Sequence, residues 1–168
     1  MIERWDARYP DGRLAGFDLI RGEAIPEGYA HLVAEVIVRH SDETHLLMQR
    51  DQVKEVYPGW YEIGASGSAL KGETAEEAAR RELLEETGIS ASDLRELYRN
   101  LEGKTIFVTF LCVTDYPKSA IKFQAGETID YRWLEPDSFQ DFFEGGAVIP
   151  PQKRRMLTYY QQWQESRP

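Results

Sequence analysis

Three glutamates, Glu82, Glu85 and Glu86, are spaced so that one helix would carry them all on the same face. Like charges at this spacing repel one another, so the arrangement is unfavourable unless cations or solvent screen the carboxylates. Carboxylate oxygens suit Mg²⁺ or Mn²⁺, which prefer octahedral oxygen coordination. Arg81, next in the chain, would pair with Glu73 and hold the glutamates in place. The spacing favours a divalent-metal site, and a solvated acidic face is the plain alternative.

The segment that carries these glutamates has clear helix start and stop signals. Thr74 followed by Glu77 is a capping-box pattern. Gly88 supplies a left-handed stop after the last turn. The sequence therefore predicts a helix over 75–87, entered from a small-residue loop at 64–67.

Composition limits the classes of protein that the chain can belong to. It has 168 residues, a net charge of −9 and 42% apolar residues, which predicts one folded domain over 1–168. The acidic balance argues against a duplex nucleic-acid binder. No apolar run approaches the roughly 20 residues that span a bilayer, and the first residues lack a signal-peptide core, so we expect a cytoplasmic protein without membrane contact. The single cysteine, Cys112, lies in an apolar run and is expected to be buried.

Around the acidic helix the pattern predicts a mixed α/β domain. An N-terminal β-hairpin occupies about residues 1–28, with a Pro-Asp-Gly turn at 10–12. Further strands are predicted at 31–39, 45–50, 60–63, 97–103, 104–115 and 127–134. Short and long C-terminal helices are predicted at 138–143 and 152–165, the latter with Met156, Leu157, Tyr160 and Trp163 at helical spacing.

The segment 67–89 resembles the signature box of the Nudix hydrolase family at every defined position. The matching residues are Gly67, Glu73, Arg81-Glu82-Leu83, Glu85-Glu86 and Gly88-Ile89. The resemblance implies an α/β/α sandwich around a mixed β-sheet, here with an N-terminal hairpin and a C-terminal helix. It also implies metal-dependent hydrolysis of a diphosphate linkage in a nucleoside di- or triphosphate, or in a nucleoside diphosphate joined to another moiety.

The resemblance also assigns roles to individual positions. Glu82, Glu85 and Glu86 match the family's metal ligands, and the ion expected is Mg²⁺, with Mn²⁺ as the alternative. The backbone carbonyl of Gly67 matches a further ligand. Glu73 and Arg81 match the family's structural ion pair.

Residues outside the box complete the predicted site. Glu127, just before a strand, is a candidate metal ligand or general base, and Glu85 and Glu86 are the other catalytic candidates. Arg50 and Lys54 follow a strand and are candidate contacts to substrate phosphates. The expected partner is a small phosphorylated molecule, of which a nucleotide is the first choice. The sequence leaves the general base, the exact substrate and homodimer formation open.

The outer frame of the chain resembles Nudix proteins related to isopentenyl-diphosphate isomerase. The shared features include Arg21-Gly22-Glu23, His31-Leu32-Val33 and the run from Leu46 to Trp60. Such an isomerase needs a cysteine in the loop after Trp60, and residues 62–67 contain none. We therefore keep isomerase activity, and a catalytically inactive nucleotide-binding domain, as alternatives to hydrolysis. His31 would match an isomerase metal ligand, but a hydrogen-bonded structural histidine is the favoured interpretation.

Overall fold

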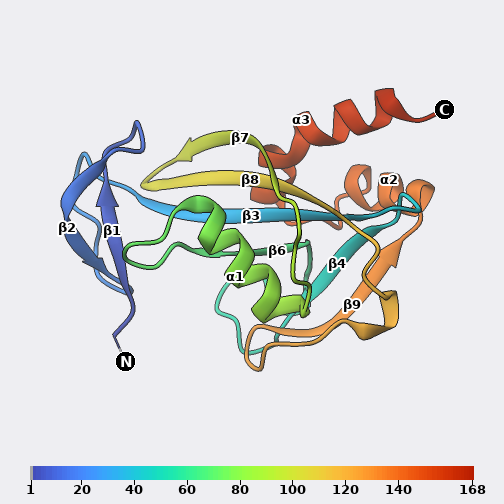
Figure 1. Ribbon diagram of the computed structural model, residues 1–168, viewed down its shortest axis with the longest axis horizontal. Helices are drawn as coiled ribbons and strands as arrows, with labels where there is room; N and C mark the ends of the chain where they lie inside the picture. Colours follow the sequence, from blue (N-terminus) through green and yellow to red (C-terminus); the bar gives the residue numbers. More distant parts are fainter. Residues whose placement is uncertain (1) are drawn as a thin grey trace.

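The computed structural model describes residues 2–168 and folds them into two sheets and three α-helices (Figure 1). A small antiparallel sheet consists of β1 (Arg4–Arg8) and β2 (Leu14–Ile20). The strands of the large sheet are β3 (His31–His40), β4 (His45–Arg50), β5 (Tyr61–Ile63), β6 (Ala65–Ser68), β7 (Arg95–Glu102), β8 (Thr105–Thr114) and β9 (Thr128–Leu134). Its main order is β5-β4-β3-β8-β7, with β6 pairing with β3 and β9 pairing with β4. A short 3₁₀ turn, η1 (Lys118–Ala120), precedes β9.

The helices cover opposite faces of the large sheet. Helix α1 (Ala75–Thr87) packs on one face, and α2 (Pro136–Glu144) and α3 (Pro150–Ser166) lie on the other. Alternate residues of β3 serve the two faces, since Leu32, Ala34 and Val36 join the core under α1 while Ile37 joins the core under α3. This arrangement confirms the predicted α/β/α sandwich. Burial on both faces explains why β3 is almost continuously apolar.

Strands β3 and β8 form the centre of the sheet and run parallel, in register from His31↔Thr105 to His40↔Thr114. The hairpin of β7 and β8 and the strands β4 and β9 lie close to their predicted positions.

Strand β6 was expected to be part of the loop that leads into α1, and that expectation is wrong. Its four small residues pair antiparallel with β3, from Val33↔Ser68 to Val36↔Ala65. Backbone pairing needs no β-favouring side chain, so the sequence carries no strand signal here. The preceding Gly64 has φ +68°, and a Cβ there would lie 1.8 Å from the carbonyl oxygen of Val36. Close approach of two backbones thus explains the small residues.

The C-terminal helices begin earlier than predicted, because Pro136 and Pro150 occupy first-turn positions that tolerate proline. In α3, Leu157 is 43% exposed, whereas the sequence pattern placed it on the buried face. Tyr159 is buried in its place, beside Met156, Tyr160 and Trp163. On this face Tyr160 and Trp163 contact the rings of Phe139 and Phe143 on α2. The Tyr159 hydroxyl lies 2.7 Å from His45 Nε2 on β4.

The N-terminal hairpin is joined to β3 at one end of the molecule. Backbone groups of Arg8 and Ala30 exchange hydrogen bonds of 2.9 and 2.8 Å, and the Trp5 ring stacks on His31 with centroids 4.4 Å apart. The hairpin thereby lies beside the loop between β6 and α1 (Figure 1), where the Lys71 backbone N–H donates to the Arg4 carbonyl at 2.9 Å. Over residues 2–168, none of the helices has the length and apolar character needed to cross a membrane.

Candidate active site

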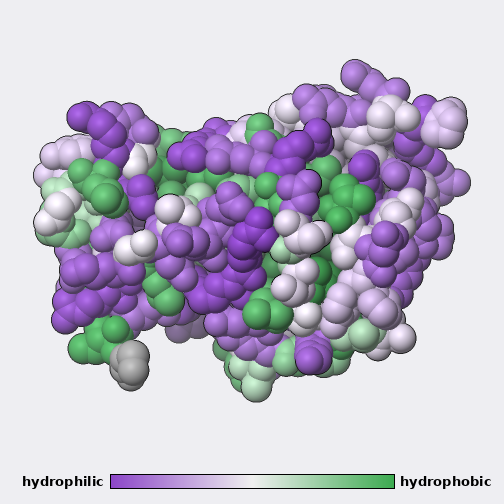
Figure 2. All heavy atoms as spheres, in the orientation of Figure 1, coloured by the Kyte–Doolittle hydropathy of each residue, from purple (hydrophilic) through white to green (hydrophobic). Residues whose placement is uncertain are grey.

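Helix α1 is fixed at both ends by the signals seen in the sequence. The Thr74 hydroxyl accepts a hydrogen bond from the Glu77 backbone N–H, and the Glu77 carboxylate accepts one from the Thr74 backbone N–H. Gly88 is left-handed at φ 79°, and its N–H donates to the Leu84 carbonyl. The capped helix buries Leu83 against the sheet, and Figure 2 shows hydrophilic side chains gathered over the centre of this face of the molecule.

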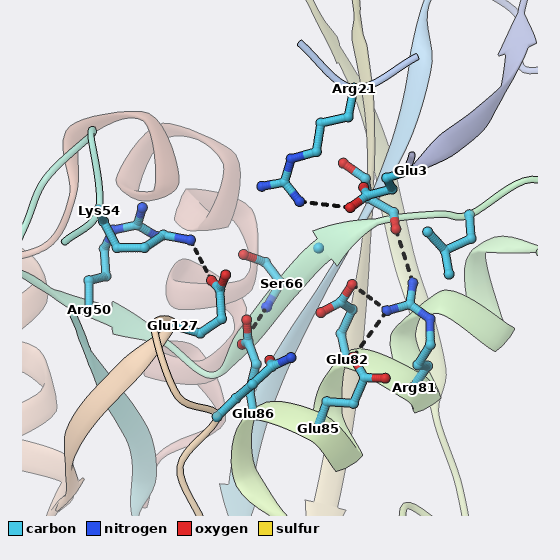
Figure 3. A pocket seen from close by; sticks show the side chains of 14 residues that line it. Glu3, Arg21, Arg50, Lys54, Ser66, Arg81, Glu82, Glu85, Glu86 and Glu127 are labelled. Atoms are coloured by element: carbon cyan, nitrogen blue, oxygen red, sulfur yellow. Dashed lines mark hydrogen bonds and ion pairs between the residues drawn. The ribbon is translucent and has the colours of Figure 1, made fainter. Parts of the chain in front are cut away.

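The three glutamates of α1 line a cavity of about 340 Å³ that opens between the helix, the N-terminal hairpin and the loops before β5 and β9 (Figure 3). Glu86 is almost fully buried, whereas the side chain of Glu85 is 42% exposed. Every residue that the sequence predicts for the site is among the residues lining or bordering this cavity: Arg50, Lys54, Gly67, Arg81, Glu82, Glu85, Glu86 and Glu127, with Glu73 bonded to Arg81.

Gly67 lies directly against the carboxylate of Glu82. A Cβ built on Gly67 would stand 2.1 Å from the Glu82 carboxyl carbon, so any side chain at this position would displace the Glu82 carboxylate. The Gly67 backbone in β6 and the Glu82 carboxylate on α1 therefore lie side by side at the cavity.

Burial of these carboxylates disfavours their charged form. Desolvation raises the pKa of Glu86 well above its usual range, and the neighbouring Glu62 and Glu82 raise it further. The pKa of Glu82 is also raised, again mainly by burial, although its hydrogen bond to Arg81 opposes the shift. Among residues 2–168, the backbone N–H of Ser66 is the one donor to Glu86, at 3.2 Å. No arginine or lysine side chain of the described residues forms an ion pair with this carboxylate.

Arg81 connects the loop before α1 to the acidic cluster. Its guanidinium donates to Glu73 at 2.7 and 2.9 Å, which is the contact predicted from the sequence, and to the Ser68 carbonyl at 3.0 Å. The Glu73 pKa is lowered chiefly by this hydrogen bond. The structure adds a feature that the sequence did not suggest, because Arg81 also donates to Glu82 at 2.6 Å and to Glu85 at 3.4 Å.

Cationic side chains occupy the wall opposite α1. Lys54 donates to the carboxylate of Glu127, and this contact brings the start of β9 to the cavity (Figure 3). Arg50 lies 3.4 Å from both carboxylate oxygens of Glu62 and donates to the Val56 carbonyl at 3.0 Å. The cavity thus has an acidic wall on α1 and a basic wall formed by Arg50 and Lys54 opposite it.

The comparisons with known proteins agree with this geometry. The family model described as "NUDIX domain" matches residues 30–156. The chain belongs to the Nudix family. It is similar to an uncharacterized Nudix hydrolase of Listeria monocytogenes, with 33% identity over 154 residues that cover 89% of both chains. A second relative, from Listeria innocua, is 32% identical over 152 residues with the same coverage.

The solved structures show the same fold. A crystal structure of a Deinococcus radiodurans protein superposes with a TM-score of 0.70 at 21% identity and covers 86% of this chain and 90% of its own. The family match and the two relatives identify the chain as a Nudix hydrolase of the pyrophosphohydrolase type. This family generally acts on nucleoside diphosphate derivatives.

Nudix enzymes generally use divalent metals, and the oxygen-rich wall of this site fits such an ion. The fit rests on buried Glu86 with a single donor and on the side-chain-free edge at Gly67. In their present positions, however, no three His, Cys, Asp or Glu side chains of residues 2–168 are arranged to hold a metal ion. Glu82 and Glu85 each accept a hydrogen bond from Arg81 through one carboxylate oxygen, and an ion would compete with Arg81 for these two side chains.

Three charged residues lining or bordering the site were not predicted from the sequence. Glu62 is buried in β5, and burial raises its pKa. The sequence feature that could have revealed it is a single carboxylate between the apolar residues Tyr61 and Ile63 of a strand. Arg21 and Glu3 reach the cavity from the N-terminal hairpin, and their types and spacing carry no signal that could have placed them there.

Two other groups considered from the sequence lie outside the site. The His31 ring stacks on Trp5, and its Nδ1 lies 3.2 Å from the Lys104 carbonyl, which fits the structural interpretation. The Cys112 thiol is buried in the core under α1, and burial raises its pKa to about 11.

Proposed function

We propose that this Nudix protein hydrolyses the diphosphate linkage of a nucleoside di- or triphosphate, or of a nucleoside diphosphate joined to another group, with bound Mg²⁺ and with Mn²⁺ as the alternative ion. The observation that carries the proposal is the division of one cavity into a buried acidic wall and a basic wall. A polyanionic substrate and an acidic helix attract each other only through a cation.

The residues of the acidic wall would hold the ion. Glu82, Glu85 and Glu86 supply carboxylates, the Gly67 carbonyl is the proposed further ligand, and the Arg81 contact to Glu73 keeps the loop against the helix. When bound, the ion polarises phosphoryl oxygens and lowers the pKa of an attacking water. Arg50 and Lys54 would bind phosphoryl oxygens from the opposite wall, where their donors can replace existing carboxylate contacts.

Glu127 is the proposed proton acceptor on the basic side of the cavity. It begins the segment that enters β9, and it contacts the Lys54 ammonium at the edge of the cavity. Glu85 and Glu86 remain the other catalytic candidates, since a general base must reach its water within hydrogen-bond distance.

One further structural neighbour adds a compound to the substrate screen. The Nudix domain of Shewanella oneidensis NrtR, described as complexed with ADP ribose, superposes with a TM-score of 0.54 at 18% identity and covers 76% of this chain. This likeness concerns the fold. Because that neighbour is described with ADP ribose, we include ADP-ribose in the substrate screen, together with nucleoside di- and triphosphates, nucleotide sugars and dinucleoside polyphosphates.

The isomerase alternative conflicts with the position of the single thiol. Cys112 is 1% exposed on β8 and lies in the core beneath α1, whereas isomerase chemistry needs a thiol at the substrate. Incubation with isopentenyl diphosphate in deuterated water tests the point directly. Label exchange into product would favour the isomerase, and its absence is expected.

The hydrolase proposal is tested by a substrate screen with and without Mg²⁺, in which released mononucleotide and phosphate are measured. Activity should vanish with a chelator and return with Mg²⁺. The matched variants are Glu86→Gln, which should lower kcat by roughly 10³-fold, and Glu76→Gln on the outer side of the same helix, where the carboxylate pairs with Arg80 at 2.7 Å. Titration calorimetry with Mn²⁺ gives a readout independent of turnover. Unchanged Mn²⁺ binding by Glu86→Gln would contradict the ligand assignment.

A further inference from the structure

The N-terminal hairpin contributes two charged residues to the cavity although it lies outside the matched Nudix segment 30–156. Arg21 follows β2, and Glu3 precedes β1. The Arg21 backbone N–H donates to the Glu3 carbonyl at 3.1 Å, which fixes the two residues side by side. In Figure 3 the Arg21 side chain extends from the hairpin toward the space between the basic wall and α1.

The guanidinium of Arg21 is paired with Glu3, and this ion pair can be broken at a small cost in free energy. It donates to Glu3 at 2.8 Å, while 60% of the Arg21 side chain remains exposed to solvent. An ion pair this exposed contributes little stability. Glu3 also accepts a hydrogen bond of 2.7 Å from the Trp5 indole, so its carboxylate keeps a donor when Arg21 leaves. Arg21 can therefore turn to another anion at small cost.

Arg21 stands with Arg50 and Lys54 between two neighbouring cavities. All three line the active-site cavity, and all three also line a second cavity of about 420 Å³ on the side of Val53 and Val56. Each of the three cations contacts one carboxylate, from Glu3, Glu62 and Glu127 respectively. Arg21 from the hairpin and the two cations of the basic wall therefore border the same two cavities, and each of the three is paired with a carboxylate.

We propose that Arg21 binds the terminal, unesterified phosphate of the substrate, with Glu3 occupying its guanidinium when no substrate is present. The proposal rests on the proposed function and narrows its substrate class to phosphate chains with a free end. A free terminal phosphate carries nearly two charges at neutral pH, whereas an esterified one carries a single charge. The planar guanidinium of Arg21 can donate two parallel hydrogen bonds to such a group. Arg21, Arg50 and Lys54 around one cavity favour the more highly charged terminal phosphate.

The first test compares matched substrates with and without a free terminal phosphate, ADP and ADP-ribose. We expect Arg21→Ala to lower the ratio of kcat/KM for ADP to kcat/KM for ADP-ribose by roughly tenfold or more, as expected for hydrogen bonds to a charged group. The control is Arg4→Ala, which removes an exposed hairpin arginine paired with Asp18 outside the cavity. An unchanged ratio in Arg21→Ala would overturn the proposal.

Glu3→Gln separates substrate binding from a structural role of the ion pair. If Arg21 only anchors the hairpin, losing either partner should have the same effect. If Arg21 binds phosphate, Glu3→Gln removes a competitor, so KM for ADP should fall or stay level while Arg21→Ala raises it. A parallel rise of KM in both variants would reject phosphate binding.

The last measurement does not depend on hydrolysis. Inorganic diphosphate is titrated into the protein with Mg²⁺ and followed by calorimetry, where Arg21→Ala should bind at least tenfold more weakly than wild type. Failure of the hydrolase proposal would appear as absent turnover with this difference intact. Equal binding by wild type and Arg21→Ala, or none by wild type, would overturn the role of Arg21.

Discussion

Two buried glutamates lie on opposite faces of the central sheet and are held in opposite ways. Glu35 on β3 is 1% exposed and accepts hydrogen bonds from the Arg155 guanidinium of α3, with Nε and Nη2 at 3.0 and 2.5 Å from Oε1. Glu86 on α1 is 3% exposed, and within residues 2–168 its donor is the Ser66 backbone N–H alone. The two carboxylates differ in their partners and hardly in their burial.

The difference indicates which buried charge serves the fold and which serves a ligand. Removing a carboxylate from water is costly, and a well-placed arginine offsets much of that cost within the protein. Arg155 does so for Glu35 and is itself packed over the Phe107 ring at 3.7 Å. Glu86 instead has Glu62 and Glu82 as charged neighbours, and both raise its pKa. Because no basic side chain in the described part of the chain offsets the charge of Glu86, we infer that this carboxylate serves to bind a cation.

The strongest test of the contrast is Glu86→Gln. We expect kcat for the best substrate to fall by roughly 10³-fold, as for loss of a principal electrostatic group. Stability should stay level or rise, because a neutral amide relieves repulsion from Glu62 and Glu82. Steady-state kinetics and thermal unfolding of the same samples measure the two effects. A strongly destabilised variant would place Glu86 in the same structural class as Glu35.

On the opposite face, Arg155→Met should show the reverse pattern. It leaves Glu35 buried without its cation, and breaking such a pair costs about 3–5 kcal/mol of unfolding free energy. Turnover per folded molecule should change little, since Arg155 lies on α3 across the sheet from α1. Urea unfolding measures the loss. Replacing Glu35 by Leu in the same chain should recover part of it, and failure to recover any would mean that the Phe107 contact matters more than the ion pair.

The same face holds a buried histidine whose titration should couple stability to pH. Burial, and then Arg39, lowers the pKa of His45 from 6.5 to about 3, and its ring stacks on Phe139 with centroids 3.8 Å apart. The folded-state pKa is depressed, so below pH 6.5 protons bind the unfolded chain first and stability falls down to about pH 3. The loss approaches about 1.4 kcal/mol per pH unit.

His45→Gln provides the reference for this pH dependence. The difference in unfolding free energy between wild type and variant should shrink as the pH falls from 6 to 4, and urea unfolding at several pH values measures it. Parallel pH profiles would show that His45 carries no depressed pKa.

The acidic wall could be predicted from the sequence because it depends on one continuous segment. The spacing of Glu82, Glu85 and Glu86 fixes a helical face, and local signals at Thr74 and Gly88 fix the helix ends. The basic wall depends on residues far apart in the chain, as the contact between Lys54 and Glu127 shows.

The parts that were missed depend on tertiary pairing in the same way. Strand β6 exists because its backbone pairs with β3, and Arg21 reaches the cavity because Arg8 and Ala30 tie the hairpin to β3. Neither contact leaves a local pattern in a single sequence. Leu157 was assigned to the wrong side of α3 because spacing alone did not distinguish it from Tyr159, which is buried against His45 on β4.

The smallest expected effect tests whether the acidic wall depends on the helix cap. Thr74→Ala removes the hydroxyl that accepts from the Glu77 N–H at 3.2 Å and should cost about 1 kcal/mol of stability. Since Glu73 adjoins the cap and holds Arg81, the loosened first turn should also weaken Mn²⁺ binding slightly, by a few-fold at most. Thr74→Ser keeps the hydroxyl and should behave like wild type in calorimetry and urea unfolding. A loss of Mn²⁺ binding as large as that of Glu86→Gln would mean that the cap, and with it the whole first turn of α1, sets the positions of the metal-binding carboxylates.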